Sequence, residues 1–291
     1  MVAILGPTGA GKSEVAFEIA ERLGAEILVC DSRQVYRHLD IATNKPPPDH
    51  LRRVPHHLID VAHPRETFTV HDFLRLATGV VDSVARRGRT VVLEGGSTLW
   101  ADALLDGYRL PGDQPVASRR AELVAAPLEE LRARLRELDP SADVDLQNPR
   151  RVVRAIEILE RLGPPLRRYR QRSAPDWCVA RFGLAIALPE LDRRLTARSQ
   201  QQVARGLAEE TRRALAAGVP KTAAVMTGIG YAQALAYLRG ELDDRTLPEA
   251  MAVANRRYAR RQLRWLRRDP RIRWVTATER PAARILSELR S

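Results

Sequence analysis

Near its start the chain reads GPTGAGKS over residues 6–13, which matches the pattern G-x-x-x-x-G-K-[ST] at every constrained position. Glycines in such a loop allow consecutive backbone N–H groups to turn around an anion, and the following helix points its positive dipole end at the same place. The run VAIL before the loop is typical of a buried strand, and SEVAFEIAERLG after it has the apolar spacing of a helix that ends at a glycine. Because strand, loop and helix occur in the order that this mechanism needs, we predict a phosphate-binding loop.

The residue types within this loop predict how the phosphates are bound. Lys12 is expected to add a positive charge beside the outer phosphates, and the Ser13 hydroxyl is an expected ligand for Mg²⁺. Gly6, Gly9 and Gly11 give the backbone room to turn. The sequence motif alone leaves open which phosphate compound is bound.

The apolar runs VAIL, AEILVC, TVVLEGG and FGLAIAL are strand-like, and each is followed by a helical or loop segment. This alternation is typical of α/β proteins, so we predict a P-loop NTPase-like parallel sheet core flanked by helices. Residues 1–111 and 179–291 are assigned to this core, with one possible closing strand near 272–275. Residues 112–178 instead contain arginine-rich helical segments separated by prolines, and we interpret them as a helical insertion.

The chain has 291 residues and a formal net charge of +12, and three of its 48 basic residues are lysines. A strongly basic chain favours a nucleic-acid partner, although heavy arginine use also follows from a GC-rich genome. No apolar run approaches the roughly 20 residues that a membrane span requires. With no signal peptide recognised, we expect a cytoplasmic protein that does not bind membranes.

Two arginine-rich segments carry charge of nearly one sign. NPRRVVRAIEILERLGPPLRRYRQR has eight arginines against two glutamates, and RRYARRQLRWLRRDPRIR has nine against one aspartate. Solvated helix faces usually mix charges of both signs, so these segments suggest contacts with phosphate backbones. Arg194 and Arg198 in RLTAR lie four residues apart on one face of a helix that follows a core strand, which could bring them to the phosphate site.

Two carboxylates follow predicted strands directly. Asp31 comes after AEILVC, and Glu94 lies at the end of TVVLE. Ligands of open parallel sheets bind beyond the carboxyl ends of the strands, so either residue could bind magnesium or act as a base. A solvated carboxylate at a strand end is the plainer alternative for both. Asp31 is the better candidate because Ser32, Gln34 and Tyr36 follow it, a set of side chains suited to reading a nucleobase.

All six histidines lie within 34 residues, between positions 38 and 71. Their spacing matches none of the usual zinc patterns, and Cys30 and Cys178 lie outside the cluster and far from each other. We therefore expect neither a zinc site nor a disulfide. The expected metal is magnesium.

These segments occur in the order and at about the spacing found in bacterial tRNA dimethylallyltransferases, and the chain resembles that family over nearly its whole length. The resemblance rests on GPTGAGKS, DSRQVY, ATNKP, PHHLID, EGGSTLW, NPRRVVRAIE, RLTAR, GIGY and RRQLRWLR. GPTGAGKS alone would fit any small P-loop kinase, whereas DSRQVY followed by ATNKP and PHHLID is much more specific. Members of this family prenylate the adenosine just 3′ of the anticodon.

The resemblance implies that the loop, from Gly6 and Pro7 through Thr8, Gly9, Ala10, Gly11, Lys12 and Ser13, holds the diphosphate of dimethylallyl diphosphate without phosphoryl transfer. It implies that Lys12, Mg²⁺ bound by Ser13, and Arg198 stabilise the charge that grows on the leaving group. Asp31 matches the general base, which would take a proton from the exocyclic amine of adenine as that amine attacks the allylic carbon.

The resemblance also implies a tRNA partner, bound through its anticodon stem-loop to an inserted α-helical tRNA-binding domain. Anticodon-loop adenines can be turned out of the stack, which suits Gln34, Tyr36 and the segment around Ser97. We expect a monomer. The residues expected to contact tRNA are Asp31, Ser32, Arg33, Gln34, Ser97, Arg150, Arg151, Val152, Val153 and Arg154.

The chain departs from the family's common pattern at several positions. Ala232 stands where many members carry a basic residue, Thr227 where arginine or glutamine is usual, and Ala42 where glycine is usual. Glu94 stands where an aliphatic or small residue is common. None of these departures removes a catalytic group.

Three other functions compete with tRNA prenylation. A small-molecule P-loop kinase that binds ATP is supported by the loop alone and leaves the arginine-rich insertion without a role. A non-catalytic nucleic-acid-binding module would bind tRNA in a salt-dependent way and be indifferent to Asp31. An adenosine-phosphate prenyltransferase would act on a free nucleotide, and the long insertion argues against it.

Overall fold

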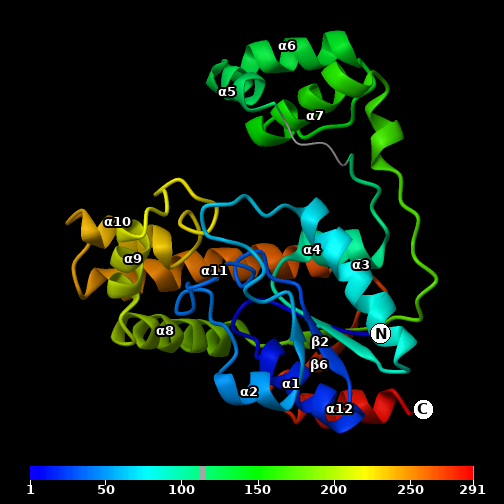
Figure 1. Cartoon of the computed structure of the whole chain (residues 1–291), viewed down its shortest axis with the longest axis vertical. Coiled ribbons are helices and arrows are strands. Elements are labelled where there is room, and N and C mark those ends of the chain that lie inside the picture. The colour runs from blue at the N-terminus through cyan, green and yellow to red at the C-terminus, as the bar shows by residue number, and fades with distance from the viewer. Residues whose placement is uncertain (112–115, 291) are drawn as a thin grey trace. The chain divides into compact units, whose positions relative to one another are not determined.

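The computed structural model describes residues 1–111 and 116–290. The chain divides into two compact units, one formed by Met1–Leu104 with Asp176–Ser291 and the other by Leu105–Pro175 (Figure 1). The second unit overlaps the insertion predicted at 112–178, with bounds at 105 and 175, and the predicted start at residue 112 lies outside the described residues. Each unit is described separately below.

The larger unit contains a six-stranded sheet with the order β3-β2-β4-β1-β5-β6. Every neighbouring pair of strands is parallel. The predicted α/β class and parallel sheet are therefore confirmed. The strands are β1 (Val2–Leu5), β2 (Glu26–Val29), β3 (His56–His57), β4 (Val91–Glu94), β5 (Ala180–Ala185) and β6 (Arg273–Thr276).

The central strands were predictable because helices cover both faces of a parallel sheet, so its strands are continuous apolar runs. All four residues of β1, β2 and β4 are buried. Strand β3 was not predicted, because it has only two residues, both of them histidines at the edge of the sheet. The core between the sheet and its covering helices includes Ile4, Ile27 and Phe182, each with no exposed surface.

The helix predicted over SEVAFEIAERLG is seen in the structure as α1 (Figure 1). The helix after the phosphate loop ends at Gly24, whose φ of 59° is the left-handed conformation that glycine adopts without strain. The helices are α1 (Lys12–Leu23), α2 (Pro48–Arg53), α3 (Val70–Arg86), α4 (Thr98–Leu105), α8 (Leu188–Ala204), α9 (Leu207–Ala216), α10 (Tyr231–Leu238), α11 (Thr246–Leu266) and α12 (Pro281–Glu288).

The smaller unit has its own hydrophobic core. It contains α5 (Ala117–Ala125), α6 (Leu128–Leu138), α7 (Pro149–Leu162) and the 3₁₀ helix η1 (Leu166–Arg170). Pro127 precedes α6 and separates it from α5, because a proline cannot continue a preceding helix. Buried leucines of α6 and the apolar face of α7, including Ile156, fill this core. The predicted helical character of the segment is therefore seen in the structure.

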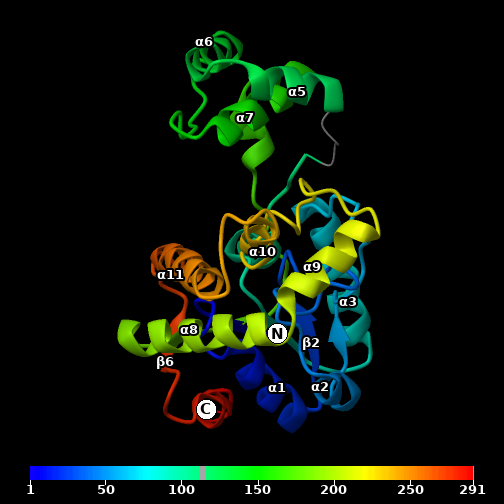
Figure 2. The same cartoon turned by 90° about the vertical axis from the view of Figure 1, so that its left-hand side faces the viewer.

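Within the larger unit, α8 and α11 pack against each other, and α9 packs against α10 (Figure 2). This packing brings α8, which follows β5, and α11, which lies near the end of the chain, next to the phosphate loop. No helix within residues 1–111 and 116–290 combines the length and the apolar character needed to cross a membrane.

Candidate active site

The phosphate loop has the backbone conformation that its glycines predict. Gly9 and Gly11 have φ values of 85° and 90°, in the left-handed region that side chains disfavour. A Cβ atom on Gly9 would also lie 2.7 Å from Cδ2 of Leu195 on α8. The loop can therefore lie against α8 only with glycine at this position.

Lys12 and Ser13 form the first turn of α1, directly after the loop. The Lys12 side chain is buried, and its Nζ donates a hydrogen bond to the Pro7 carbonyl at 3.0 Å. Burial lowers the pKa of Lys12, while the carboxylates of Glu94 and Asp31 raise it. Lys12 is thus a cation inside the loop with two carboxylates as its electrostatic partners.

Asp31 follows β2 at the carboxyl edge of the sheet. Its Oδ1 accepts hydrogen bonds from the backbone N–H groups of Arg33, at 2.8 Å, and Gln34, at 3.4 Å. These bonds hold the carboxylate in place and leave Oδ2 for another partner. Burial raises the pKa of Asp31, and the two backbone hydrogen bonds oppose that shift. A fixed carboxylate with a raised pKa is suited to accept a proton.

Glu94 is the last residue of β4, and it is only 2% exposed. Its Oε2 accepts a hydrogen bond from the Ser13 hydroxyl at 3.3 Å. Burial raises the pKa of Glu94 to about 7, with Lys12 opposing the shift and Asp31 adding to it. Asp31 and Glu94, whose roles the sequence left undecided, therefore both lie beside the phosphate loop.

Arg198 reaches the same loop from α8. Its Nη2 donates hydrogen bonds to the Thr8 hydroxyl, at 2.9 Å, and to Oδ1 of Asn255, at 3.3 Å. Burial lowers the pKa of Arg198, and Asp31 opposes that shift. Its Nε is buried without a hydrogen-bond partner in the described part of the chain. The guanidinium therefore has donor capacity left for a ligand.

These groups surround one pocket of about 260 Å³. Its wall combines donors and cations of the phosphate loop with the two carboxylates, and the Oε1 atom of Gln34 is buried there without a partner among the described residues. The predicted site residues that line it are Thr8, Gly9, Gly11, Lys12, Ser13, Asp31, Gln34 and Arg198.

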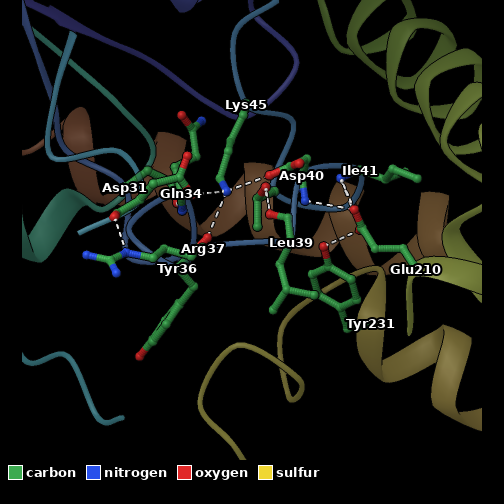
Figure 3. Close-up of polar contacts among 12 residues, drawn as sticks. Asp31, Gln34, Tyr36, Arg37, Leu39, Asp40, Ile41, Lys45, Glu210 and Tyr231 are labelled. Carbon is green, nitrogen blue, oxygen red and sulfur yellow. Dashed lines mark hydrogen bonds and ion pairs between the residues drawn. The ribbon is translucent and has the colours of Figure 1, made fainter. Parts of the chain in front are cut away.

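The segment 39–45 adds Thr43 and Asn44 to this wall. Both belong to ATNKP, which carries the family resemblance but was given no role in the site. Glu210 of α9 holds the segment by accepting hydrogen bonds from the backbone of Asp40, at 2.9 Å, and Ile41, at 3.1 Å (Figure 3). Tyr231 donates to the same carboxylate at 2.6 Å. Because these partners come from distant parts of the chain, the sequence does not show that the segment packs against the phosphate loop.

One face of α11 carries three polar residues that contact this site. Asn255 Oδ1 accepts a hydrogen bond from Arg198, and the Tyr258 hydroxyl donates one to the Gly96 carbonyl at 2.8 Å. Gln262 forms hydrogen bonds both with the phosphate loop and with Gly96. Gln262 Oε1 accepts from the Thr8 N–H at 2.8 Å, and its Nε2 donates to the Gly96 carbonyl at 2.6 Å. These three residues were not predicted as part of the site. The sequence signal that could have revealed them is their spacing of three and four residues among apolar residues of one helix.

Replacing Gln262 with leucine should loosen the phosphate loop. The Thr8 N–H would lose its partner, so we expect the free energy of unfolding to fall by about 1–3 kcal/mol and the affinity for inorganic diphosphate to fall as well. Chemical unfolding and calorimetric titration measure the two effects. Gln201→Leu, at an exposed position of α8, is the control and should stay within about 0.5 kcal/mol of the wild type. Unchanged diphosphate affinity in Gln262→Leu would contradict this role.

The structure corrects two predictions about nucleobase or tRNA contact. Tyr36 is 1% exposed, and its hydroxyl accepts a hydrogen bond from the Phe68 N–H at 3.2 Å, so its ring cannot stack on an adenine. Val152 and Val153 are 0% and 4% exposed in the core of the smaller unit. Their side chains pack against other apolar residues and cannot contact RNA.

The other predicted tRNA contacts lie at two places. Ser32 donates its N–H to the Ser97 hydroxyl at 2.9 Å, next to Asp31, and Arg33 donates to the Ala224 carbonyl. Arg150, Arg151 and Arg154 lie on α7 in the smaller unit. Arg151 pairs with Asp145 at 3.4 Å and Arg154 pairs with Glu157 at 3.4 Å, whereas Arg150 is exposed and has no ion pair within the described residues.

The exposed face of α11 is a second concentration of charge. Arg257, Arg260 and Arg264 are exposed there, and Arg267 is exposed directly after the helix. None of the four forms an ion pair with an acidic side chain in the described chain. Their spacing of three or four residues places them along one side of the helix. This arginine row supports the sequence interpretation of the segment as a surface for phosphate backbones.

His50 and His57 have ordinary structural partners. The His50 ring stacks on Phe17 with centroids 3.8 Å apart, and His57 Nε2 lies 2.7 Å from the buried carboxylate of Glu26. In residues 1–111 and 116–290, no three histidine, cysteine or acidic side chains form a group that could hold a metal ion by themselves.

Comparison with known proteins identifies the family. The model of the IPP transferase family matches residues 34–269. A tRNA dimethylallyltransferase of Thermomicrobium roseum is 40% identical over 291 residues, covering 96% of this chain and 87% of its own length. The crystal structure of a tRNA isopentenylpyrophosphate transferase of Bacillus halodurans is similar with a TM-score of 0.75 and 31% identity, covering 99% of this chain and 95% of that chain.

The fold is also shared by a eukaryotic dimethylallyltransferase acting on tRNA, with a TM-score of 0.85, 22% identity and coverage of 98% of this chain and 77% of that one. The matched region begins at Gln34, whose N–H donates to Asp31. It includes the insertion, Arg198 and nearly all of the arginine-rich segment at 256–273. On this evidence the chain belongs to the IPP transferase family.

Proposed function

We propose that the chain transfers a dimethylallyl group from dimethylallyl diphosphate to the exocyclic amine of the adenosine 3′ of the anticodon in tRNA. The single observation that carries this proposal is the pocket in which the phosphate loop, Arg198 and the Asp31 carboxylate meet. A phosphoryl transferase can also use a carboxylate base, so it is the match to the IPP transferase family that favours prenyl transfer over phosphoryl transfer. The fixed carboxylate beside the loop fits a reaction in which a proton leaves the acceptor.

The proposed reaction forms one bond and breaks one. The amine nitrogen of adenine bonds to C1 of the dimethylallyl group, the C1–O bond breaks, and its electron pair leaves with the diphosphate. The amine proton passes to Asp31, whose raised pKa favours accepting it. Donors of the loop, Lys12 and Arg198 stabilise the charge that grows on the diphosphate oxygens.

Magnesium fits the site through the Ser13 hydroxyl. This hard oxygen ligand lies on the first turn of α1 and lines the pocket, as a magnesium ligand beside a diphosphate requires. When bound, the ion would neutralise charge on the departing diphosphate.

The proposed tRNA contact uses both arginine-rich surfaces, the row on α11 and the face of α7 around Arg150. Phosphate contacts of this kind position an RNA without reading its sequence. The base itself would be read in the pocket, where Gln34 Oε1 is buried without a partner among the described residues and can accept a hydrogen bond from a base edge.

The direct test is label transfer. Purified chain, dimethylallyl diphosphate labelled in the prenyl group, and unmodified tRNA should yield labelled tRNA and one free diphosphate per transfer. Label in free adenosine phosphates, or turnover of ATP with a small acceptor and no need for RNA, would instead support the competing enzymatic functions. RNA binding with no transfer to any of several tRNAs that carry adenosine at this position would support a binding module.

Replacing Arg150 with alanine should weaken tRNA binding. This exposed arginine has no competing ion pair in the described chain, so its loss should lower the affinity and reduce the salt slope of binding by about 1. Arg136→Ala, which removes an exposed arginine from α6 of the same unit, is the control. Binding measured at several salt concentrations checks this, and equal effects of the two variants would argue against a specific contact on α7.

A further inference from the structure

Glu94 is placed where a magnesium ligand is needed. Strand β4 lies between β1 and β2 in the sheet, and Glu94 pairs with Ile4 on one side and Val29 on the other. It therefore lies between the strand that leads into the phosphate loop and the strand that leads to Asp31. Its carboxylate contacts the Ser13 hydroxyl at 3.3 Å.

A buried carboxylate without a cationic partner is costly. Glu94 is 2% exposed, yet in the described part of the chain it forms no ion pair with a basic side chain. The nearby Lys12 ammonium donates instead to the Pro7 carbonyl at 3.0 Å. The Glu94 carboxylate thus accepts one hydrogen bond, from the Ser13 hydroxyl to Oε2, and the Lys12 charge acts on it without a direct ion pair among the described residues, which leaves the carboxylate available to a cation.

We propose that the Glu94 carboxylate and the Ser13 hydroxyl together bind Mg²⁺, with diphosphate oxygens and water completing the coordination. This proposal rests on the proposed function, because it takes the phosphate loop as the diphosphate site. Magnesium bound to phosphates commonly takes one or two protein oxygens and few more. In phosphate-loop enzymes, the loop serine or threonine and an acidic residue after a sheet strand supply them.

The site is incomplete without its substrate. In residues 1–111 and 116–290, no three acidic, histidine or cysteine side chains form a group that could hold a metal ion, so the Glu94 carboxylate and the Ser13 hydroxyl need further ligands. Magnesium and diphosphate should therefore bind together, each strengthening the other. Without the ion, Glu94 repels the diphosphate. With the ion, it attracts the complex, so the sign of its effect depends on magnesium.

The test is calorimetric titration of the full chain with inorganic diphosphate, in magnesium and in EDTA. Glu94→Gln removes the charge and keeps the shape and the acceptor for Ser13. Glu14→Gln is the matched control, because Glu14 lines the same pocket but its carboxylate is exposed and lies 4.0 Å from His50 Nε2. Glu94→Asp keeps the charge and moves it away from Ser13.

In magnesium, Glu94→Gln should bind diphosphate more weakly than the wild type, on the order of 10- to 100-fold. In EDTA it should bind as tightly as the wild type or more tightly. Glu14→Gln should leave the ratio of the two affinities unchanged, and Glu94→Asp should lower that ratio by less than the glutamine variant.

An equal loss in magnesium and EDTA would show that Glu94 only supports the loop and would overturn the proposal, as would no loss in either. If Glu94→Gln does not fold, Glu94→Asp decides in the same way: a reduced ratio supports the proposal, and an unchanged one overturns it. The titration uses neither RNA nor prenyl transfer. A failed label-transfer assay with a magnesium-specific defect in Glu94→Gln would therefore reject the proposed function and keep the metal site.

Discussion

Replacing Asp31 with asparagine should lower the rate of prenyl transfer by about 10²- to 10⁴-fold, the usual contribution of a general base. Asparagine keeps an oxygen that can accept from the Arg33 and Gln34 N–H groups, so the loop should hold its conformation. It cannot take the amine proton. Single-turnover transfer to unmodified tRNA measures the loss, and diphosphate titration is the control, because the affinity for diphosphate should not fall.

The pH dependence follows from the same carboxylate. Burial raises the pKa of Asp31 above its ordinary value, and only the ionised form accepts a proton. The wild-type rate should therefore fall as the pH is lowered through that pKa, and this acidic decline should be absent from the residual rate of Asp31→Asn. A variant with near wild-type rates, or with the same acidic decline, would remove Asp31 from the role of base.

Replacing Arg198 with alanine should also lower the rate of prenyl transfer strongly. We expect the rate of transfer to fall by about 10²- to 10³-fold, as when one donor to a developing anion is removed. The Thr8 hydroxyl and Asn255 would also lose their shared partner. Because the charge on the diphosphate grows in the transition state, the loss should appear in kcat more than in KM.

Arg194 provides a matched control one helical turn away. It lines the same pocket, but its Nε donates to Glu190 at 2.7 Å, so its guanidinium is already held by a carboxylate. Arg194→Ala removes one positive charge from the same helix and should reduce the rate far less than Arg198→Ala. Rates measured at saturating substrate compare the two, and equal losses would mean that the net charge of α8 matters rather than the position of one guanidinium.

The parts of the site that were predictable depend on local chain geometry. The phosphate loop is a local structure, and its glycines, lysine and serine reveal it without tertiary information. Asp31 and Glu94 were recognisable because a polar residue directly after a buried strand must lie at the ligand-binding edge of a parallel sheet. Arg198 needed the family resemblance, since helical spacing alone only placed it on a face that could reach the loop.

The missed parts depend on tertiary packing. Asn255 and Gln262 contact residues more than 50 positions away in the chain, and Gln262 meets Thr8 across a separation of 254 residues. Thr43 lines the pocket in a segment that the distant Glu210 holds through the backbone of Asp40. No local pattern specifies which helix packs over the phosphate loop, so these residues could not be assigned from composition or spacing.

The errors have equally specific causes. Tyr36 follows Ser32 and Gln34, which suggested that its ring stacks on a nucleobase. The same sequence is equally compatible with a ring packed in the core, which is what the structure has. The Tyr36 hydroxyl, satisfied by a backbone N–H, allows the ring to be buried. Val152 and Val153 were carried over with their arginine neighbours, although apolar residues on an amphipathic helix face its core.

The central claim is that the diphosphate departs at the loop around Lys12 while Asp31 takes a proton from an adenine held beside it. A crystal structure with an anticodon stem-loop RNA and a slowly reacting thio-analogue of dimethylallyl diphosphate tests this most directly. The account predicts the diphosphate against residues 8–13 and the adenine amine within about 3 Å of the Asp31 carboxylate. An amine directed at another residue, or a diphosphate bound away from the loop, would contradict it.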